Sequence, residues 1–235
     1  MTEDGWGVRI TDKDSTDPVT TPLCTSINGK PIVSMTKMFW FSKAESVDLS
    51  SFDTTNVTNM NSMFYSSKAT SLDLSTFDTS NVTSMYGMFT GCRSTLDLRS
   101  FDTSSVTDMS FMFMGISAAH SLDLSSFNTS NVISMKWMFY QSVASTIDLS
   151  SFDTSSVTNM NSMFFQNFAT TLDLSSFDTS DVTDMSSMFY QSSVTTGYAR
   201  TQIDANRFNN IAGSLSNGNN PGTGISNTLT FVVKP

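Results

Sequence analysis

Histidine and cysteine are nearly absent from this chain of 235 residues, which contains one histidine and two cysteines. Cys24 and Cys92 are far apart, and neither belongs to a Cys-x-x-Cys pair or a Cys/His cluster. The sequence therefore predicts neither a disulfide framework nor a zinc site. His120 has no second histidine to work with, and nothing marks one serine among so many as a nucleophile. We interpret His120 as a turn residue and expect no enzymatic activity, no metal and no cofactor.

Charged residues are also scarce, at 14% of the chain, and 12 Lys and Arg against 21 Asp and Glu give a formal net charge of −9. This balance argues against nucleic acid as a partner, because binding to a phosphate backbone depends on clustered Lys and Arg. No apolar run approaches the ~20 residues that span a bilayer, so we expect no membrane insertion. Residues 1–10 are acidic and broken by glycines, so no secretory signal is predicted in the chain as given.

Repetition is what the sequence has in abundance. The words "SFDTTNVTNMNSMF" at 51–64 return as "TFDTSNVTSMYGMF" at 76–89 and in four later copies. A unit this short cannot bury its own apolar face, so successive units must stack and share one core. The central aspartates of a Leu-Asp-Leu motif, or a close variant of it, keep the same period of about 25 residues: Asp48, Asp73, Asp97, Asp123, Asp148 and Asp173.

Each unit predicts one strand and one short helix. Leu72 and Leu74 alternate with polar residues and share one face of a strand. Val82, Met85 and Phe89 then form one apolar stripe at helical spacing. The expected fold class is an α/β solenoid of strand–turn–short-helix coils with one parallel sheet. Because helices need more room between axes than strands, we expect the array to bend with its sheet inside. The predicted strands are 47–49, 72–74, 96–98, 122–124, 147–149 and 172–174.

The repeated pattern LDLSxFDTSxVTxMxxMF resembles the BspA-like leucine-rich repeats of bacterial surface proteins, over roughly residues 33 to 195. The segment "TTGYARTQIDANRFNN" at 195–210 is similar to the one that closes such arrays. The resemblance implies a leucine-rich-repeat solenoid, extracellular or surface display, and adhesion to macromolecules of a host or a neighbouring cell. It brings no catalytic residues with it.

The ends of the chain read as caps on this array. We predict an N-terminal cap at 1–32, the repeat array at 33–195 and a C-terminal cap at 196–235. Caps protect the open ends of a continuous core. In the last segment, Ile203, Phe208 and Ile211 would form one helical face, 216–224 is a loop by composition, and 228–233 is a plausible final strand.

Three repeated columns could be imagined as metal sites. The Leu-Asp-Leu aspartates could collect Ca²⁺, but a calcium loop gathers its oxygens from one tight turn, so we favour a ladder that keeps the sheet soluble. We interpret a second row of acids as turn caps: Asp53, Asp78, Asp102, Asp153 and Asp178, with Asn128 in the remaining copy. We interpret the repeated methionines as core fillers rather than as a soft-metal ladder: Met60, Met85, Met109, Met135, Met160 and Met185.

The middle copies depart from the repeat at positions that the core does not dictate. Outer copies carry small polar residues there, whereas the middle copies carry aromatic rings, and Phe111 and Trp137 occupy the same slot in adjacent coils. Exposed aromatics and arginine are enriched at binding hot spots. The candidate partner-binding residues are Tyr86, Arg93, Arg99, Phe111, Met114 and Trp137. The alternative is sequence drift combined with a lateral contact to a flanking copy or an oligomer partner.

The sequence favours a non-enzymatic recognition or adhesion module, displayed on a cell surface or secreted, that binds a protein or glycan. The alternative is a structural or receptor-binding component of a phage or phage-like particle. Such a component would be assembled in the cytoplasm and would need no signal peptide.

Overall fold

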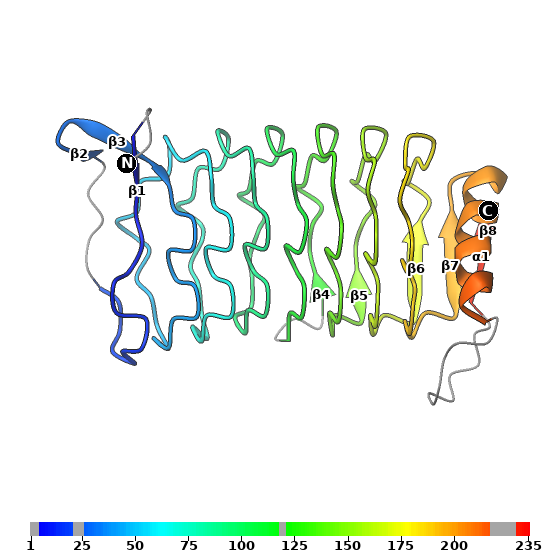
Figure 1. Ribbon diagram of the computed structural model, residues 1–235, viewed down its shortest axis with the longest axis horizontal. Coiled ribbons are helices and arrows are strands. Elements are labelled where there is room, and N and C mark those ends of the chain that lie inside the picture. The colour runs from blue at the N-terminus through cyan, green and yellow to red at the C-terminus, as the bar shows by residue number, and fades with distance from the viewer. Residues whose placement is uncertain (1–4, 21–25, 118–120, 217–228) are drawn as a thin grey trace.

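The structure is a computed structural model and describes residues 5–20, 26–117, 121–216 and 229–235. Cys24 and His120, with the prediction of a turn at His120, lie outside the described residues. Figure 1 shows an elongated stack of coils, with the two ends of the chain at opposite ends of the stack. Within the described residues, no helix is both long and apolar enough to cross a membrane.

The strands are short, and the longest regular elements lie at the ends of the stack. In chain order the elements are β1 (Trp6–Gly7), β2 (Ser26–Ile27), β3 (Lys30–Ser34), β4 (Ser121–Leu122), β5 (Thr146–Ile147), β6 (Thr171–Leu174), β7 (Thr196–Ala199), α1 (Gln202–Ser216) and β8 (Thr230–Val233), with β4 and β5 in the middle coils. The strands form sheets of order β1-β3-β2, β4-β5 and β6-β7-β8. All pairs are parallel except β2 with β3, a hairpin whose turn residues Asn28 and Gly29 both adopt the positive φ that such a turn requires.

The described part of the chain is therefore rich in strands and built on parallel pairing, as predicted, but its strands form three small sheets and not the expected single one. β4, β5 and β6 overlap three of the predicted strands, whereas Ser46, Ser71 and Thr95 make only isolated parallel bridges at the equivalent earlier positions. The chain turns directly after the Leu-Asp-Leu motif. The Phe77 N–H donates to the Leu74 carbonyl at 3.0 Å, and this turn ends the strand.

The predicted short helices are wrong. In residues 85–92 the N–H groups of Met88, Thr90 and Cys92 donate to carbonyls three residues back. The N–H groups between them, those of Phe89 and Gly91, donate to the next coil at 3.0 and 2.7 Å. The segment is a series of overlapping turns, with positive φ at Gly87 and Gly91. Coils stacked at strand spacing, ~4.8 Å, leave no room for helices, whose axes need ~8–10 Å.

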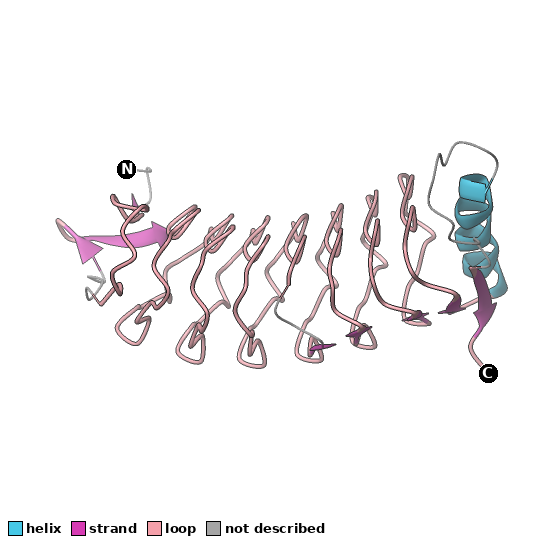
Figure 2. Ribbon diagram, turned by 90° about the horizontal axis from the view of Figure 1, so that it is seen from below, coloured by secondary structure: helices cyan, strands magenta, loops and turns pink. Residues whose placement is uncertain are grey.

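This wall of turns also explains the shape of the stack. The turn segments contact their neighbours through hydrogen bonds as the strands do, so both sides of a coil keep the same spacing. A second column of parallel bridges joins Ser34, Asn59 and Ser84 and continues through later coils to Asp184. The predicted bend with the sheet inside has no cause here, and Figures 1 and 2 show coils stacked without a tight bend.

The core lies inside the coils and runs the length of the stack. Leu72, Leu74 and Val82 of one coil are buried, and Phe89 stacks between Phe64 and Phe113 with ring centroids 5.8 and 6.0 Å away. The interpretation of the repeated methionines as core fillers is confirmed, since all six are buried. The buried aromatic rings of each coil stack on those of the next coil, which makes the core continuous.

The C-terminal end follows the prediction in part. Helix α1 covers the predicted helical segment and buries Phe208 against the core, but Ile203 is 74% exposed and does not belong to the inner face. Strand β8 lies within the predicted final strand. The predicted loop at 216–224 lies almost entirely outside the described residues. The division at 1–32, 33–195 and 196–235 stays a prediction; β3 runs across its first boundary and β7 begins at the last.

Candidate functional site

Six aromatic rings form a continuous row on the outside of the stack. Tyr86 lies 5.0 Å from Phe111, and Phe111 lies 5.4 Å from Trp137, measured between ring centroids. The row continues from Trp137 to Tyr140 at 4.6 Å, and on through Phe165 to Tyr190 at 4.8 and 4.9 Å. We call the row the aromatic ladder: Tyr86, Phe111, Trp137, Tyr140, Phe165 and Tyr190. The expected neighbourhood of Phe111 and Trp137 is confirmed.

Three different positions of the repeat supply these rings, since Tyr86 lies one residue before the slot that Phe111 and Trp137 share. Tyr140, Phe165 and Tyr190 each follow a buried Met-Phe pair, a position that holds Thr90 and Met114 in the middle coils. In the two coils where that position lacks a ring, the preceding turn supplies Tyr86 or Phe111, and Trp137 adds a ring in the turn before Tyr140. The sequence reasoning missed Tyr140, Phe165 and Tyr190, although an aromatic after most Met-Phe pairs was a readable signal.

The turns hold Phe111 and Trp137 in a backbone conformation that bulky residues seldom adopt. Their φ angles are 63° and 61°, and the equivalent position holds Gly87 and Ser162 in other coils. A non-glycine residue in this region costs about 1–2 kcal/mol. The ring contacts, each worth ~0.5–1.5 kcal/mol, offset this cost.

The ladder is half-buried, and its rings shield one another's faces. The interplanar angles are 28° at Phe111–Trp137 and 15° at Trp137–Tyr140, so the rings stack and present mainly their edges outward. The Trp137 indole N–H donates to Asn161 Oδ1 at 2.8 Å. Burial raises the pKa of Tyr86, and the nearby Asp108 and Tyr65 raise it further. With 39% of its surface exposed, Tyr86 is the most open of the six rings.

The three other predicted site residues do not join this row of rings. Arg99 lies on the Leu-Asp-Leu side of the coil, where its Nε and Nη2 donate to the two Asp97 carboxylate oxygens at 2.9 and 2.5 Å. These bonds lower the pKa of Asp97 to about 2. Arg93 is exposed. Met114 is half-buried at the ladder position that follows a Met-Phe pair.

The aspartate rows bond within their own turns. Asp48 Oδ1 accepts from the Ser50 N–H at 2.9 Å and from the Ser50 hydroxyl at 2.6 Å, and these bonds lower the pKa of Asp48. The second row is confirmed as turn caps: Asp78 Oδ1 accepts from the N–H and hydroxyl of Ser80, and Asn128 caps Ser130 in the same way. Among the described residues, no three His, Cys, Asp or Glu side chains gather as a metal site would require.

Comparison of the sequence with models of known protein families identifies the family of this chain. A family profile described as "Mycoplasma protein of unknown function, DUF285" matches residues 21–121 and 114–217. The chain belongs to the DUF285 family. No curated protein and no solved structure matches it.

A buried threonine column joins the coils of this DUF285 chain, and the sequence reasoning did not find it. The Thr154 hydroxyl donates to the Asp178 carbonyl at 2.8 Å and accepts from the Asp178 N–H at 2.8 Å, so one hydroxyl bridges two coils twice. The column consists of Thr54, Thr79, Thr103, Thr129, Thr154 and Thr179, all of them buried. Each member donates to the following coil or to the cap.

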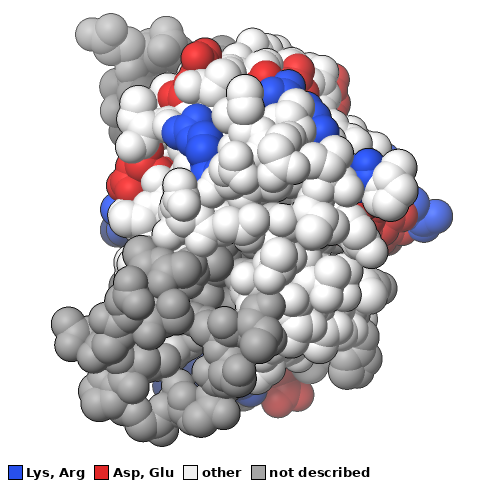
Figure 3. All heavy atoms as spheres, turned by 90° about the vertical axis from the view of Figure 1, so that its right-hand side faces the viewer, with Lys and Arg blue, Asp and Glu red and all other residues white. Residues whose placement is uncertain are grey.

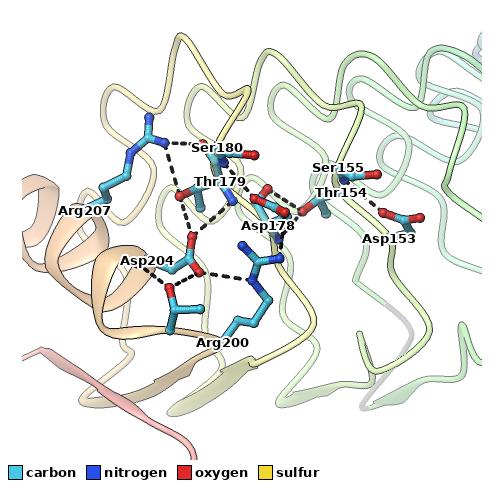
Figure 4. A network of polar contacts seen from close by, with 10 residues as sticks. Asp153, Thr154, Ser155, Asp178, Thr179, Ser180, Arg200, Asp204 and Arg207 are labelled. Atoms are coloured by element: carbon cyan, nitrogen blue, oxygen red, sulfur yellow. Dashed lines mark hydrogen bonds and ion pairs between the residues drawn. The ribbon is translucent and has the colours of Figure 1, made fainter.

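At the last coil a side chain replaces the missing carbonyl (Figure 4). The Thr179 hydroxyl donates to Asp204 Oδ1 at 2.7 Å, and Asp204, on the first turn of α1, is 2% exposed. Thr201 caps the same helix, since its hydroxyl accepts from the Asp204 N–H at 3.1 Å and donates to Asp204 Oδ2 at 2.6 Å. Arg207 donates to the carbonyls of Thr179 and Val182. The DUF285 array thus closes on an acid–arginine cluster.

Hydrogen bonds and nearby charge keep the Asp204 carboxylate of this cluster ionised. Burial alone would raise the pKa of Asp204, but hydrogen bonds from Thr201, Thr179 and Arg200 outweigh it and lower the pKa. Arg200 also donates to Asp178 Oδ2 at 2.6 Å. Figure 3, which views this end of the stack, shows only scattered charged side chains on a mostly uncharged surface. The charged side chains of this cluster therefore stabilise the junction between the last coil and α1, and they do not form an open charged patch.

Proposed function

We propose that this DUF285 chain is a BspA-like leucine-rich-repeat solenoid that serves as a non-enzymatic recognition or adhesion module. It acts at a cell surface or in secreted form and binds a protein or glycan through the face that carries the aromatic ladder. The observation that carries the proposal is the ladder itself, six aromatic rings in successive contact on the outside of a stack whose core is already filled.

Two features support a binding role beyond stability. Phe111 and Trp137 lie at turn positions where the backbone favours glycine, so the fold itself does not require aromatic side chains there. Half-exposed aromatics also release more apolar surface on contact than small polar residues do, and they dominate binding energy at interfaces. The repeat gives the ladder a rigid backing, because each coil is hydrogen-bonded to both neighbours.

The test is saturable binding of the fluorescently labelled chain to intact bacterial and epithelial cells. The double variant Phe111→Ser/Trp137→Ser carries the residue that outer coils have at this slot, and we expect its apparent affinity to fall by about tenfold or more. Ile133→Thr, on an exposed position that is threonine in other coils, is the matched control and should bind like the parent. Binding that never saturates, or that the double variant retains in full, contradicts the proposal.

A further inference from the structure

Beside the C-terminal half of the ladder lies a row of glutamine side chains. Gln141 Nε2 donates to Gln166 Oε1 at 2.6 Å, and Gln166 Nε2 donates to Gln191 Oε1, so three consecutive coils are linked by side-chain amides. Each amide has two N–H donors and a carbonyl with two acceptor sites, and at Gln166, in the middle of the row, one bond in each direction does not exhaust them. We call Gln141, Gln166 and Gln191 the amide column.

The backbone does not call for glutamine at these positions. Gln141, Gln166 and Gln191 have φ of 53°, 50° and 54°, and the same position is Gly91 and Gly115 in the preceding coils, with φ of 62° at both. Glycine adopts this conformation without steric cost, whereas other residues lose about 1–2 kcal/mol. The amide side chains are thus present at a conformational cost that the mutual hydrogen bonds offset only in part.

Two residues beyond Gln141 and Gln166 lies an exposed apolar position, which is Ser193 in the following coil. Val143 and Phe168 occupy it in neighbouring coils, joined by the backbone bond from Phe168 N–H to the Ser142 carbonyl at 3.2 Å. They are 37% and 56% exposed. Within the described residues no aromatic ring stacks on Phe168, unlike the rings of the ladder. Phe168 therefore offers an open ring on the outer surface.

The charge of this surface changes along the stack. The position of Val143 and Phe168 holds Lys43, Lys68 and Arg93 in earlier coils, whereas the last coils carry no charged side chain there, in the amide column or in the ladder. The rest of the chain is strongly acidic, with a net charge of −9. At these positions an anionic ligand is repelled by that field and meets no cation, and a cationic ligand finds no carboxylate to pair with. Electrostatic complementarity therefore favours an uncharged ligand.

We propose that the amide column, with Val143, Phe168 and the adjoining ladder rings, binds a neutral linear polysaccharide that lies along the stack. Amides both donate to and accept from hydroxyl groups, and an open aromatic ring packs against the apolar face of a sugar. The groups recur once per coil, at strand spacing of ~4.8 Å, so they present a repeating surface to a repeating polymer. This inference rests on the proposed recognition function and names its ligand class.

The experiment is affinity electrophoresis of the full chain through gels containing hydroxyethyl cellulose, laminarin or dextran. Carboxymethyl cellulose is the anionic counterpart of the first polymer. We expect retardation by at least one neutral polymer and little by the anionic one. Phe168→Ser, which installs the residue of Ser193 one coil later, and Gln166→Gly, which relieves the backbone, should each weaken retention by about tenfold. Lys68 occupies the position of Phe168 in an earlier coil, and Lys68→Ser should retain full binding.

The outcomes separate this inference from the proposed function. Retention by none of the neutral polymers, or retention that Phe168→Ser and Gln166→Gly leave unchanged, overturns the polysaccharide site. If cell binding still depends on Phe111 and Trp137 in that case, the recognition function stands with another ligand. Phe168 is largely exposed, so the melting temperature of Phe168→Ser should match that of the parent, and Gln166→Gly gives an independent reading.

Discussion

Trp137 and Tyr140 belong to the same coil, and their rings stack with centroids 4.6 Å apart at an angle of 15°. Through this contact the aromatic ladder passes from one position of the repeat to another. Phe111 on one side and Phe165 on the other stack against the same pair. The two residues therefore form the joint of a row that would otherwise be two separate groups.

Removing the joint should weaken the fold as well as the row. We expect Trp137→Ser to lower the free energy of unfolding by about 1–3 kcal/mol, because two ring contacts worth ~0.5–1.5 kcal/mol each are lost. Ile133→Thr in the same coil should change it by less than about 0.5 kcal/mol. Urea denaturation measures both, and an unchanged stability for Trp137→Ser would show that the stacking contributes nothing.

The C-terminal closure should be the most sensitive polar position. Asp204→Ala leaves the buried hydroxyl of Thr179 and the Nε of Arg200 without their acceptor, and we expect a loss of about 2–4 kcal/mol. Hydrogen exchange should show the last coil and α1 opening first, since each coil contacts only its neighbours. Asp181→Ala, an exposed acid near the same end, is the control. Uniform loss of protection along the whole stack would contradict a local role.

Stability should fall in acid. The carboxylates of Asp48, Asp97 and Asp204 have lowered pKa values in the folded chain, and that of Asp97 falls from 3.8 to about 2. A group with a depressed folded pKa contributes stability above its unfolded pKa and loses it as the pH falls through the folded pKa. The unfolding free energy should therefore be level at neutral pH and decline from below about pH 4 toward pH 2. Urea titrations across this range measure it, and a rise on acidification would contradict the assignment.

Metal should not be needed for the fold. The aspartate oxygens of the Leu-Asp-Leu motifs already accept hydrogen bonds within their own turns, as Asp73 does from Ser75 at 2.6 and 3.0 Å. Thermal unfolding with EDTA and with added Ca²⁺ should coincide. A melting temperature several degrees higher with Ca²⁺ would revive these carboxylates as a calcium site.

The sequence predicted the repeat, the parallel pairing and the buried positions, because periodicity and apolar alternation are local properties. It did not predict the turns, since Val82, Met85 and Phe89 are spaced equally well for a helix or for overlapping turns. Only the stacking distance between coils decides between the two. Gly87 and Gly91 were the available signal, because both need positive φ.

For the candidate site, the proximity of Phe111 and Trp137 could be predicted because the two residues occupy equivalent positions in adjacent coils. The contact of Trp137 with Tyr140 did not, because it joins two positions of one turn whose shape the sequence left open. Arg99 was misplaced for a similar reason. Its partner Asp97 lies two residues away, on the Leu-Asp-Leu side of the coil. An ion pair between two residues of the same turn cannot be recognised by comparing the sequence of one repeat with that of another.

The threonine column has a mechanical consequence. Its hydroxyl bonds and the backbone bonds between coils all join one coil to the next, so tension applied between the two ends of the stack is carried in series by every junction. The load that the whole chain bears is then set by its weakest junction, and coils beyond that point stay intact while one opens. A chain under such tension lengthens in steps of one coil, each step releasing a segment of about 25 residues.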